Sequence, residues 1–461
     1  MENIIFLNRK READLITKLK KDNFFIVVKG RRRIGKTTFL RKFLPKGVYL
    51  FIWPNKSLGW VMENICTEHS FPKFKNFKDL LAYLLEQKKI VILDEFQNFL
   101  NVDKSVYGEI QKVIDERKAR KEFYKIAVAG SSYSLMNKVF NDVASPLYGR
   151  RTAEIVLDRL PVKDLFLALN TSMEKFVKFW AVFEGVPYYY ELIDLKSSPE
   201  ENFKKLILGK EAQLQDEGKV VLSVEFGRDS KTYMTVLSSI AEGKTKLNEI
   251  ASMFENKTNE VGKYLDILRN EFKLVRRVTP LLADPQKSKE GHYEVIDNFL
   301  DFWFCFVDKK KSYLEQERFE EVESFFGNNF NSFVGRKFEK FILSLVKSEI
   351  LKLGFKVEKA GRQWGSLYST SKNKNQYEID LCGVNEKSKK ILFGECKWEE
   401  KADAEKLLKE LKEKARSVVW NNTRRKEYYC IFARSFKAKK LKEKNLYLFD
   451  LGDLEKILKW G

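Results

Sequence analysis

The chain has 461 residues, 44% of them hydrophobic and 14% aromatic, which can fill the cores of two to four domains and excludes global disorder. Its 86 Lys and Arg outnumber its 65 Asp and Glu, and the net charge of +21 favours a polyanionic partner, nucleic acid before membrane, although a Lys-rich, thermophile-like surface has the same composition. Because there are only two histidines, histidine-based zinc clusters and most Ser/His/Asp triads are excluded, and hydrolysis must rest on carboxylates, Lys, Arg and a hard metal ion.

The cysteines and the apolar runs indicate the cellular setting. The five cysteines include no CxxC pair, which fits a reducing compartment and argues against a disulfide framework. No charge-free apolar run approaches the ~18 residues of a membrane span, and MENIIFLNRKREADL does not have the pattern of a signal peptide. We therefore expect a cytoplasmic protein without a membrane partner.

Apolar runs and helical patterns alternate near the N-terminus, which predicts a parallel sheet with helices on both faces. From about residue 160 to 230 the pattern is helical, and 231–282 predict three short helices followed by a basic hairpin. The aromatic stretch 292–307 predicts a buried connector, and a helix from residue 330 begins a final α/β unit. The expected strands of the N-terminal sheet are 24–30, 47–53, 90–95, 124–130 and 153–157.

The stretch GRRRIGKTT follows the first expected strand, precedes a helical pattern, and matches the P-loop motif GxxxxGK[ST] at every position. Its glycines allow backbone N–H groups to surround the phosphates of a nucleotide, and the helix directs its positive end toward them. We expect Lys36 to contact the β and γ phosphates and the Thr37 hydroxyl to bind Mg²⁺. The predicted phosphate-binding residues are Gly30, Arg31, Arg32, Arg33, Ile34, Gly35, Lys36, Thr37 and Thr38.

Two adjacent carboxylates follow the third expected strand. Asp94 ends the apolar run IVIL and is expected in the outer shell of the metal, while Glu95 is placed to polarise the attacking water. After the fourth strand, a hydroxyl of Ser131 or Ser132 either contacts the γ-phosphate or caps the next helix, and both alternatives stay open. The predicted ligand is ATP with Mg²⁺.

Together with FLNRKREADL, LDEFQ, AGSS, SPLYGRR and EGVPYYY, these residues resemble the archaeal P-loop ATPases related to the AAA+ and STAND groups, over nearly the whole chain. The resemblance implies an ASCE-type parallel sheet of order 5-1-4-3-2, with Asp94 on the third strand and Ser131 after the fourth. It also implies that Arg150 stabilises γ-phosphate charge, within the chain or across a subunit boundary of a homo-oligomer; the alternative is a structural contact with acidic residues. The implied nucleotide site further includes Asn8 and Arg9 near adenine and Pro187 of the turn Gly185-Val186-Pro187.

Apolar spacing over 231–282 is typical of a winged helix-turn-helix with a turn at Gly243 and the basic wing FKLVRRV. In one interpretation its third helix and wing bind DNA. In the other, the module packs against the ATPase as part of its lid, and both interpretations stay open. The predicted DNA-binding residues are Lys257, Lys263, Arg269, Arg276 and Arg277.

Residues 411–444 include twelve Lys or Arg and three Asp or Glu, a net charge of +9. Aromatic residues interleave with them, and this mixture lets a surface hold phosphates and stack bases, whereas most charge runs are only solvated faces. The aromatic residues are Trp420, Tyr428, Tyr429 and Phe436, and the predicted DNA contacts are Arg424, Arg425 and Lys426.

The segments QYEIDLCGV and KILFGECKW both alternate, and the turn-rich NEKSK between them predicts a hairpin centred near Lys387. This register places Asp380 almost opposite Glu395, with Lys397 on the same face. Carboxylates ~5 Å apart repel each other unless a divalent cation lies between them, and Lys397 is then placed to orient water or steady the charge on the phosphorane. The alternative is an exposed hairpin with a salt bridge between Glu395 and Lys397.

The D-x(n)-E-x-K pattern resembles the PD-(D/E)xK nuclease fold, with the departure that Ile379 rather than proline precedes Asp380. The resemblance implies a restriction-endonuclease-like α/β domain whose first helix supplies Glu339 from FVGRKFEKFILSLV. The implied metal site then consists of Glu339, Asp380 and Glu395 and takes Mg²⁺ or Mn²⁺.

These patterns predict an ATPase that couples a nucleotide switch to DNA binding and Mg²⁺-dependent DNA cleavage. The alternatives are a STAND-like regulatory ATPase whose C-terminal domain binds nucleic acid without cutting it, and an ATP-switched winged-helix transcription regulator. The predicted catalytic residues are Lys36, Glu95, Arg150, Asp380, Glu395 and Lys397. The predicted domains are an ATPase core at 1–159, a helical lid at 160–230, a winged helix at 231–282, a connector at 283–329 and a nuclease-like domain at 330–461.

Overall fold

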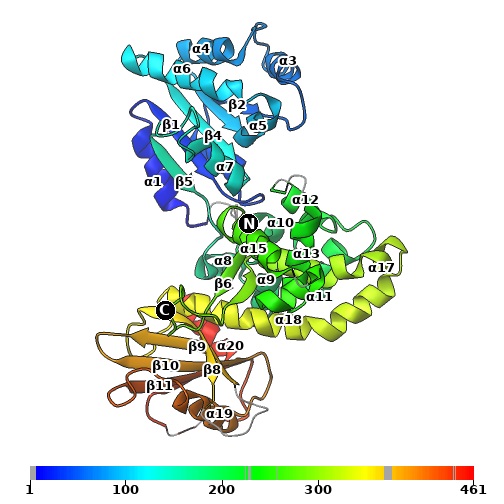
Figure 1. Cartoon of the computed structure of the whole chain (residues 1–461), viewed down its shortest axis with the longest axis vertical. Coiled ribbons are helices and arrows are strands. Elements are labelled where there is room, and N and C mark those ends of the chain that lie inside the picture. Colours follow the sequence, from blue (N-terminus) through cyan, green and yellow to red (C-terminus); the bar gives the residue numbers. More distant parts are fainter. Residues whose placement is uncertain are drawn as a thin grey trace.

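The computed structural model describes residues 7–223, 225–226, 230–255, 257–367, 376–439, 441 and 443–460. Three parts follow one another along the long axis of the molecule: an N-terminal sheet domain, a helical middle part and a C-terminal sheet domain (Figure 1). Over these ranges, no helix has both the length and the apolar character needed to cross a membrane.

The N-terminal domain contains a five-stranded sheet with helices on both faces. Its strands are β1 (Phe24–Lys29), β2 (Gly47–Phe51), β3 (Ile90–Asp94), β4 (Lys125–Gly130) and β5 (Ala153–Val156). Its helices are α1 (Lys10–Leu19), α2 (Lys36–Phe43), α3 (Leu58–Glu68), α4 (Phe77–Glu86), α5 (Phe99–Val102), α6 (Ser105–Ala119) and α7 (Tyr133–Phe140).

All strands of this sheet are parallel and their order is β2-β3-β4-β1-β5, which confirms the order that the family resemblance implies. Strand β1 is buried along its whole length because it lies inside the sheet and helices cover both faces. Ile26 and Val28 pack in the core that includes α1 and α2, whereas Phe25 and Val27 pack in the core under α3, α4, α6 and α7. The sheet thereby fixes the carboxyl ends of β1, β3 and β4 side by side, where the candidate nucleotide residues lie.

The middle part is helical, as the sequence predicts. The helices that follow the first sheet are α8 (Val162–Leu169), α9 (Met173–Phe183), α10 (Pro187–Leu192), α11 (Pro199–Phe203), a π-helical turn (Lys204–Leu208) and α12 (Glu217–Ser223). Next come α13 (Ser230–Ala241), α14 (Leu247–Ala251), α15 (Thr258–Asn270) and the antiparallel strands β6 (Val275–Val278) and β7 (His292–Val295). Helices α16 (Asn298–Phe306) and α17 (Lys311–Glu315) complete this part.

Two elements lie at other positions than the sequence indicated. The hairpin expected within 231–282 has its second strand, β7, at His292–Val295, inside the stretch that was expected to be a connector. A short strand with a single buried residue leaves little apolar alternation, and the aromatic run of α16 begins three residues later. The last domain was expected to begin at residue 330, but its first helix, α18 (Phe319–Lys347), begins eleven residues earlier.

The C-terminal domain has a mixed five-stranded sheet of order β12-β11-β10-β9-β8. Strands β8 and β9 and strands β9 and β10 pair antiparallel, whereas β10, β11 and β12 pair parallel. The elements after α18 are β8 (Lys359–Ser366), β9 (Gln376–Asn385), β10 (Lys390–Lys397), α19 (Ala404–Arg416), β11 (Lys426–Ala433), β12 (Leu446–Phe449) and α20 (Leu451–Trp460).

One apolar core joins the three parts. It runs from one face of the N-terminal sheet through the helices of the middle part and α18 to one face of the C-terminal sheet. The aromatic side chains of α16, among them Phe299, Phe302 and Trp303, are buried in it, so the prediction that this stretch is packing is confirmed. Because the core is continuous, the parts are packed together rather than joined by flexible linkers.

Candidate functional site

The phosphate loop lies between β1 and α2. Glycine is needed at two of its positions, for a different structural reason at each. Gly35 has a φ of +91°, a left-handed conformation that favours glycine, and it caps the start of α2. At Gly30, a Cβ atom would lie 2.6 Å from the carbonyl oxygen of Leu157, so only glycine fits beside β5. The loop is thus held against the neighbouring strand and opens at the N-terminus of a helix, where anions bind favourably.

The Lys36 side chain is only 6% exposed and donates from Nζ to the carbonyl oxygen of Arg31 (3.0 Å). Burial lowers the pKa of Lys36 below its usual value, and the carboxylates of Glu95 and Asp94 oppose this effect. A buried ammonium group facing a backbone loop is poorly solvated, so the phosphates of a nucleotide are suitable partners for it.

Thr37 and Asp94 meet at the carboxyl end of β3. The Thr37 hydroxyl donates to Asp94 Oδ2 (2.5 Å), and the same oxygen accepts a hydrogen bond from the Tyr49 hydroxyl (2.7 Å). Asp94 is nearly completely buried. A hydroxyl and a carboxylate oxygen held together next to the phosphate loop are the ligand types that Mg²⁺ accepts, so this set fits a nucleotide-bound magnesium ion.

Glu95 follows β3 and contacts Ser131, which follows the neighbouring strand β4. Its Oε2 accepts hydrogen bonds from Ser131 Oγ (2.6 Å) and from Nε2 of Gln97 (2.6 Å). Ser132 is the helix cap, because its hydroxyl accepts from the backbone N–H of Leu135 at the start of α7. The two roles that the sequence left open thus belong to neighbouring serines: capping to Ser132 and a place beside Glu95 to Ser131.

Glu225 is a site residue that the sequence analysis missed. Its carboxylate accepts from the hydroxyls of Ser132 (2.7 Å) and Ser134 (2.9 Å) and from the N–H of Tyr133 (3.1 Å). It therefore binds at the N-terminus of α7, next to the carboxyl end of β4. No motif surrounds Glu225, and only the tertiary packing brings it there.

A cavity of about 340 Å³ lies beside the phosphate loop. Arg9, expected near adenine, is buried behind it and donates to the carbonyl oxygen of Asp158 (2.6 Å), whereas Asn8 bonds to Asp164. Pro187 is buried at the first position of α10, next to Val186 in the cavity wall. The wall includes Arg31, Arg32, Ile34, Leu157, Arg159 and Asp297, so loop, β5 end and middle part all contribute to it.

Arg150 lies at the other end of the sheet. Thr152 pairs with Phe25 near the beginning of β1, roughly 16 Å of strand away from the phosphate loop. The Arg150 guanidinium forms an ion pair with Asp115 of α6 (2.9 Å) and donates to the carbonyl oxygen of Pro146. It cannot contact a nucleotide of its own chain, so the expected γ-phosphate contact stays a prediction only for a neighbouring subunit.

In the C-terminal domain, the predicted hairpin is confirmed. Leu381 of β9 pairs with Gly394 of β10, and continuing this register by one residue puts Asp380 opposite Glu395. Asp380 Oδ2 accepts from the backbone N–H of Cys396 (2.9 Å). Burial and the neighbouring Glu395 carboxylate raise the pKa of Asp380 to about 6.

Glu339 projects from α18 toward the same strand end. Burial, together with the charge of Asp380, raises the pKa of Glu339 to about 8. Arg362 of β8 lies 3.9 Å from Glu339 and contacts Glu378, and its Nη1 forms an ion pair with Glu294 of β7 (2.9 Å). The three predicted acids therefore influence one another electrostatically, with an arginine beside them that the sequence analysis did not select.

Glu395, only 3% exposed, is paired with two lysines. Lys397 Nζ lies 2.7 Å from Oε1, and Lys414 Nζ lies 2.8 Å from Oε2. Lys414 was missed because it comes from α19, where no sequence spacing relates it to the hairpin. Within the described ranges, no three His, Cys, Asp or Glu side chains are close enough to form a ready ligand set for a metal. The oxygen donors suit a hard cation, but their present spacing does not enclose one.

The residues predicted to bind DNA in the middle part are largely engaged within the chain. Arg276 forms an ion pair with Glu294 (2.7 Å), and Arg277 donates to the carbonyl oxygens of Pro285 and Ser288. On α15, Lys263 is exposed, Lys257 lies beside Glu255, and Arg269 pairs with Asp266. The buried side chains of α13, α14 and α15 belong to the continuous core. These contacts favour the packing role over DNA binding.

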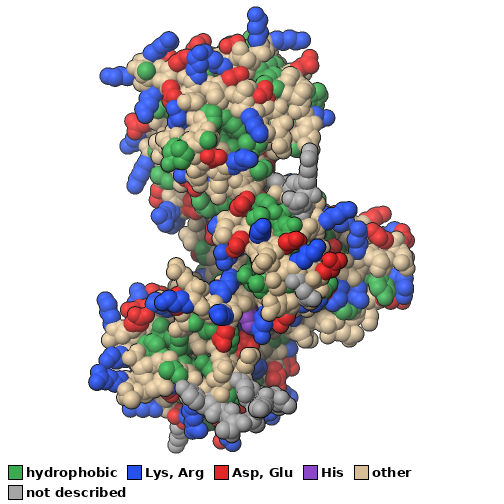
Figure 2. All heavy atoms as spheres, viewed as in Figure 1, with side chains coloured by type: hydrophobic (Ala, Val, Ile, Leu, Met, Phe, Trp, Pro, Cys, Tyr) green, Lys and Arg blue, Asp and Glu red, His purple; other side chains and the backbone are tan. Residues whose placement is uncertain are grey.

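Residues 440 and 442 of the segment 411–444 lie outside the described ranges. For the rest of this segment, the prediction of a surface that stacks bases is partly wrong. Tyr428 and Tyr429 are buried in cores, so they are not free to stack on bases. The Arg425 side chain is only 6% exposed and pairs with Glu427 (2.7 Å), whereas Arg424 and Lys426 are exposed. On the face seen in Figure 2, Lys and Arg are interspersed with Asp and Glu over all three parts.

Comparison with known proteins gives matches over most of the chain. Residues 22–163 match a family model described as an AAA domain, and residues 303–408 match one described as archaeal and bacterial proteins of unknown function. An uncharacterized protein of Methanocaldococcus jannaschii is 30% identical over 97% of this chain and 100% of its own length.

Solved structures give weaker similarities. A Walker-type ATPase of Pyrococcus abyssi has a TM-score of 0.48 at 15% identity, covering 65% of this chain and 96% of that one. The Orc2 protein of Aeropyrum pernix has a TM-score of 0.40 at 14% identity, covering 68% of this chain and 98% of that one.

Proposed function

The chain belongs to the family of the Methanocaldococcus jannaschii protein and has an AAA-type P-loop ATPase domain, and from this we propose that it couples ATP binding and hydrolysis to DNA binding and metal-dependent DNA cleavage in its C-terminal domain. The observation that carries the C-terminal half of the proposal is the register of β9 and β10, which puts Asp380 opposite Glu395 when it is continued by one residue, together with the effect of the Asp380 charge on Glu339. The middle part is then a lid that includes a winged helix in a packing role.

The residues around the phosphate loop support the ATPase half. Lys36 would neutralise the β and γ phosphates, and Thr37 with Asp94 would hold the magnesium ion. Glu95 would orient the attacking water, with its own carboxylate fixed by Ser131 and Gln97. A carboxylate held in one position by two donors needs little reorganisation to act on water.

The raised pKa values of Asp380 and Glu339 support a cation site in the C-terminal domain. Burial is the larger cause of both shifts and a neighbouring carboxylate is the second, and a divalent cation at this place would favour the ionised carboxylates. Asp380, Glu395 and Glu339 would hold Mg²⁺ or Mn²⁺, which when bound supplies an activated water and shields the scissile phosphate. Lys397, beside Glu395, would orient this water and stabilise charge on the phosphate.

One observation favours a second candidate, an ATPase whose C-terminal domain binds nucleic acid without cutting it. Glu395 is already paired with both Lys397 and Lys414, and two ammonium groups can satisfy its charge without a metal. The third candidate, an ATP-switched transcription regulator, has less support because the helices α13–α15 are packed in the core and Arg276 and Arg277 are engaged within the chain.

The test is the variant Asp380→Asn, which keeps the shape of the side chain and removes its charge. Metal-dependent cleavage of single-stranded, duplex and branched DNA should fall by about 10²-fold or more, while ATP turnover without DNA stays at the wild-type level because the phosphate loop lies in another domain. Lys397→Ala should lose cleavage to a similar degree but still bind metal. If the wild type cleaves none of these substrates with Mg²⁺ or Mn²⁺, with or without ATP, the second candidate replaces the first.

A further inference from the structure

A series of partly buried ion pairs begins at the phosphate loop. Arg31 Nη1 lies 2.6 Å from Asp297 Oδ2, and Arg31 Nη2 donates to the carbonyl oxygen of Lys273 (2.6 Å). Asp297 is 7% exposed and caps α16 by accepting from the N–H of Leu300 (3.1 Å). A residue of the loop that would surround the phosphates is thus tied to the segment between β7 and α16.

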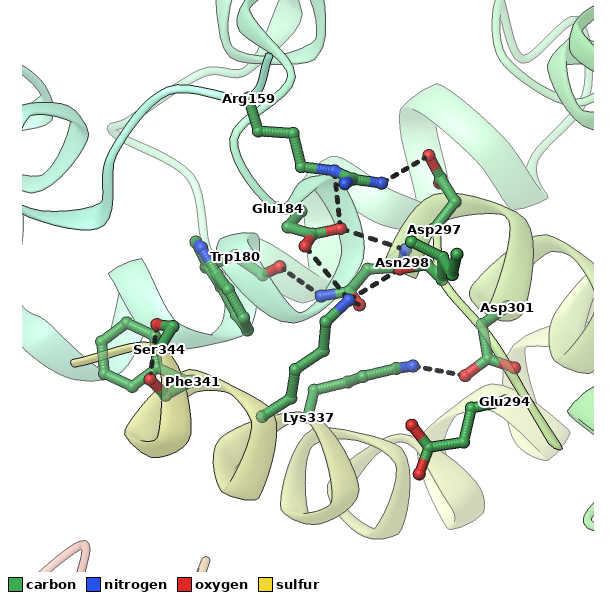
Figure 3. A network of polar contacts seen from close by, with 12 residues as sticks. Arg159, Trp180, Glu184, Glu294, Asp297, Asn298, Asp301, Lys337, Phe341 and Ser344 are labelled. Atoms are coloured by element: carbon green, nitrogen blue, oxygen red, sulfur yellow. Dashed lines mark hydrogen bonds and ion pairs between the residues drawn. The ribbon is translucent and has the colours of Figure 1, made fainter. Parts of the chain in front are cut away.

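The second step passes through Arg159, which follows β5 and lines the same cavity as Arg31. Arg159 Nη2 contacts Asp297 (3.3 Å) and Nε contacts Glu184 Oε2 (2.9 Å), as Figure 3 shows. Burial alone would raise the pKa of Asp297, but Arg31 and Arg159 outweigh it and lower the value to about 2. Asp297 therefore stays ionised and binds both arginines at once.

This series of ion pairs ends at Lys340, on α18. Lys340 Nζ lies 3.1 Å from Glu184 Oε1 and donates to the carbonyl oxygen of Ile296 (2.7 Å) and to Asn298 Oδ1 (2.7 Å). The residue before it on the same helix is Glu339, which faces Asp380 at the C-terminal carboxylate site. Because both residues lie on one continuous helix, a displacement of Lys340 also displaces Glu339.

Two carboxylates are shared among three cations in this series of contacts: Asp297 pairs with Arg31 and Arg159, and Glu184 pairs with Arg159 and Lys340. Asp158 adds a third negative charge near Arg159. Buried ion pairs are weak sources of stability because desolvation offsets most of the Coulomb attraction, and apolar residues in their place often stabilise a protein as well or better. Shared carboxylates can instead be redistributed among their cations when charge is added, and the phosphates of a nucleotide add negative charge at the Arg31 end of this series.

We propose that Asp297 and Glu184 are positioning residues through which a nucleotide bound at the phosphate loop regulates the C-terminal carboxylate site by way of Lys340. The inference rests on the proposed function for the identity of the regulated site. Phosphates that attract Arg31 release Asp297 to Arg159, the hold of Arg159 on Glu184 weakens, and Glu184 pairs more closely with Lys340. Nucleotide binding thereby fixes α18, and Glu339 with it, relative to the hairpin of β9 and β10.

The experiment compares amide hydrogen exchange with and without a non-hydrolysable ATP analogue and Mg²⁺. In the wild type, the analogue should slow exchange at the phosphate loop and also around Lys340 in α18, the latter by about 5-fold or more, the lower end of ordinary allosteric coupling. The double variant Glu184→Gln with Lys340→Met removes one carboxylate and one cation together. It should keep the response of the loop and lose that of α18 to within about 2-fold.

A matched control pair also involves α18. Lys337 of α18 forms an ion pair with Asp301 of α16, close to Lys340 (Figure 3). The ion pairs of Arg31 and Arg159 described above do not include these two residues. Asp301→Asn with Lys337→Met should keep the response of α18. Circular dichroism and thermal unfolding verify that each double variant folds. If the test variant does not fold, Asp297→Asn replaces it, because this change removes the contact with Arg31 and keeps the shape of the side chain.

The proposal is overturned if the test variant retains the α18 response, if the control variant loses it equally, or if the wild type responds only at the loop. These readouts need no DNA cleavage, so they separate the two hypotheses. If α18 responds to the nucleotide and the protein has no nuclease activity, only the proposed cleavage is wrong. If the protein cleaves DNA and α18 does not respond, only the proposed coupling is wrong.

Discussion

Among the candidate catalytic residues, Glu95 is held both by hydrogen bonds to its side chain and by its backbone conformation. Its carboxylate receives hydrogen bonds from Ser131 and Gln97 while its backbone adopts a φ of +53°, in the left-handed region that is uncommon for a residue with a side chain. This conformation belongs to the turn between β3 and Phe96–Asn98 and fixes the direction in which the chain leaves the strand. This geometry supports a role in orienting water rather than in binding phosphate.

We predict that Glu95→Gln retains ATP binding and loses turnover by about 10²–10⁴-fold, since an amide cannot act as a base toward water. Lys36→Ala serves as the contrasting variant, because it removes the buried ammonium of the phosphate loop and should abolish tight ATP binding. Calorimetric titration measures affinity and phosphate release measures turnover. Loss of ATP binding in Glu95→Gln would instead show a structural role for this side chain.

Glu339 makes stability depend on pH. Its pKa is raised from the usual 4.5 to about 8 by burial and by Asp380, so the folded state binds this proton more tightly than the unfolded state does. The stabilising contribution is therefore present below the usual pKa and is lost as pH rises toward about 8. A divalent cation at the site would oppose the loss, because it favours the ionised carboxylate.

We expect Glu339→Gln to gain stability relative to the wild type between about pH 5 and about pH 9, since its amide does not titrate. Added Mg²⁺ should raise the melting temperature of the wild type at the higher pH and that of the variant much less. Differential scanning fluorimetry at both pH values is sufficient. Glu386→Gln, which removes an exposed ion pair with Lys359, is the control and should change little. An equal pH response of variant and wild type would contradict the argument.

At the scale of elements, the strand pair β6–β7 connects the middle part to the C-terminal sheet. Glu294 of β7 binds Arg276 of β6 and Arg362 of β8, and the segment after β6 adds a backbone hydrogen bond from Leu281 to Arg362. His292 of β7 also packs against Trp364 of β8. An element that was expected to meet DNA is therefore an internal contact between domains.

The basic residues Arg424, Arg425 and Lys426, around the start of β11, are of two kinds: Arg424 and Lys426 are exposed, and the Arg425 side chain is buried. We predict that the double variant Arg424→Ala with Lys426→Ala weakens DNA binding and lowers the log–log salt slope by roughly 0.9 for each phosphate that the protein no longer neutralises. Arg425→Ala should instead lower stability, because this buried guanidinium donates to the carbonyl oxygens of Val418 and Ala415 and pairs with Glu427. Fluorescence anisotropy at several salt concentrations and thermal unfolding distinguish these effects. An unchanged salt slope in the double variant would mean that these two exposed side chains are only solvated.

At the scale of the whole molecule, the position of Arg150 bears on assembly. It lies at the opposite end of the sheet from the phosphate loop and is partly exposed, so any contact with a nucleotide has to be made in a second copy of the chain. Its exposed pairing with Asp115 is expected to stabilise the fold by only about 0–1 kcal/mol, which leaves it free to exchange partners.

We predict that Arg150→Ala lowers ATP turnover without lowering ATP affinity, and that mixing it with Lys36→Ala restores part of the turnover. In the mixture, a Lys36→Ala chain supplies the arginine to an Arg150→Ala chain that still binds ATP. Arg151→Ala, whose guanidinium contacts Asn141 and Glu154, is the control. If the mixture is no more active than the sum of its components, the arginine does not act between chains.

The sequence by itself determined those features whose cause is local. The P-loop, the positions of the five strands of the N-terminal sheet, Asp94 and Glu95, and the register of Asp380 with Glu395 all follow from backbone periods, turn residues and glycine positions that a short stretch contains. The assignment of Ser132 as a cap was among the stated alternatives for the same reason. Each of these features depends on residues that are close in the chain.

Only the tertiary structure decided the features that depend on partners far apart in the chain. Lys414 pairs with Glu395 across nineteen positions, and Arg31 meets Asp297 across 266. Arg425 and Tyr429 belong to a basic, aromatic stretch, yet packing buries them, while β7 becomes a strand only because β6 pairs with it. A side chain carries no local record of the partner that will neutralise or cover it, because burial and ion pairing arise from how the elements pack together.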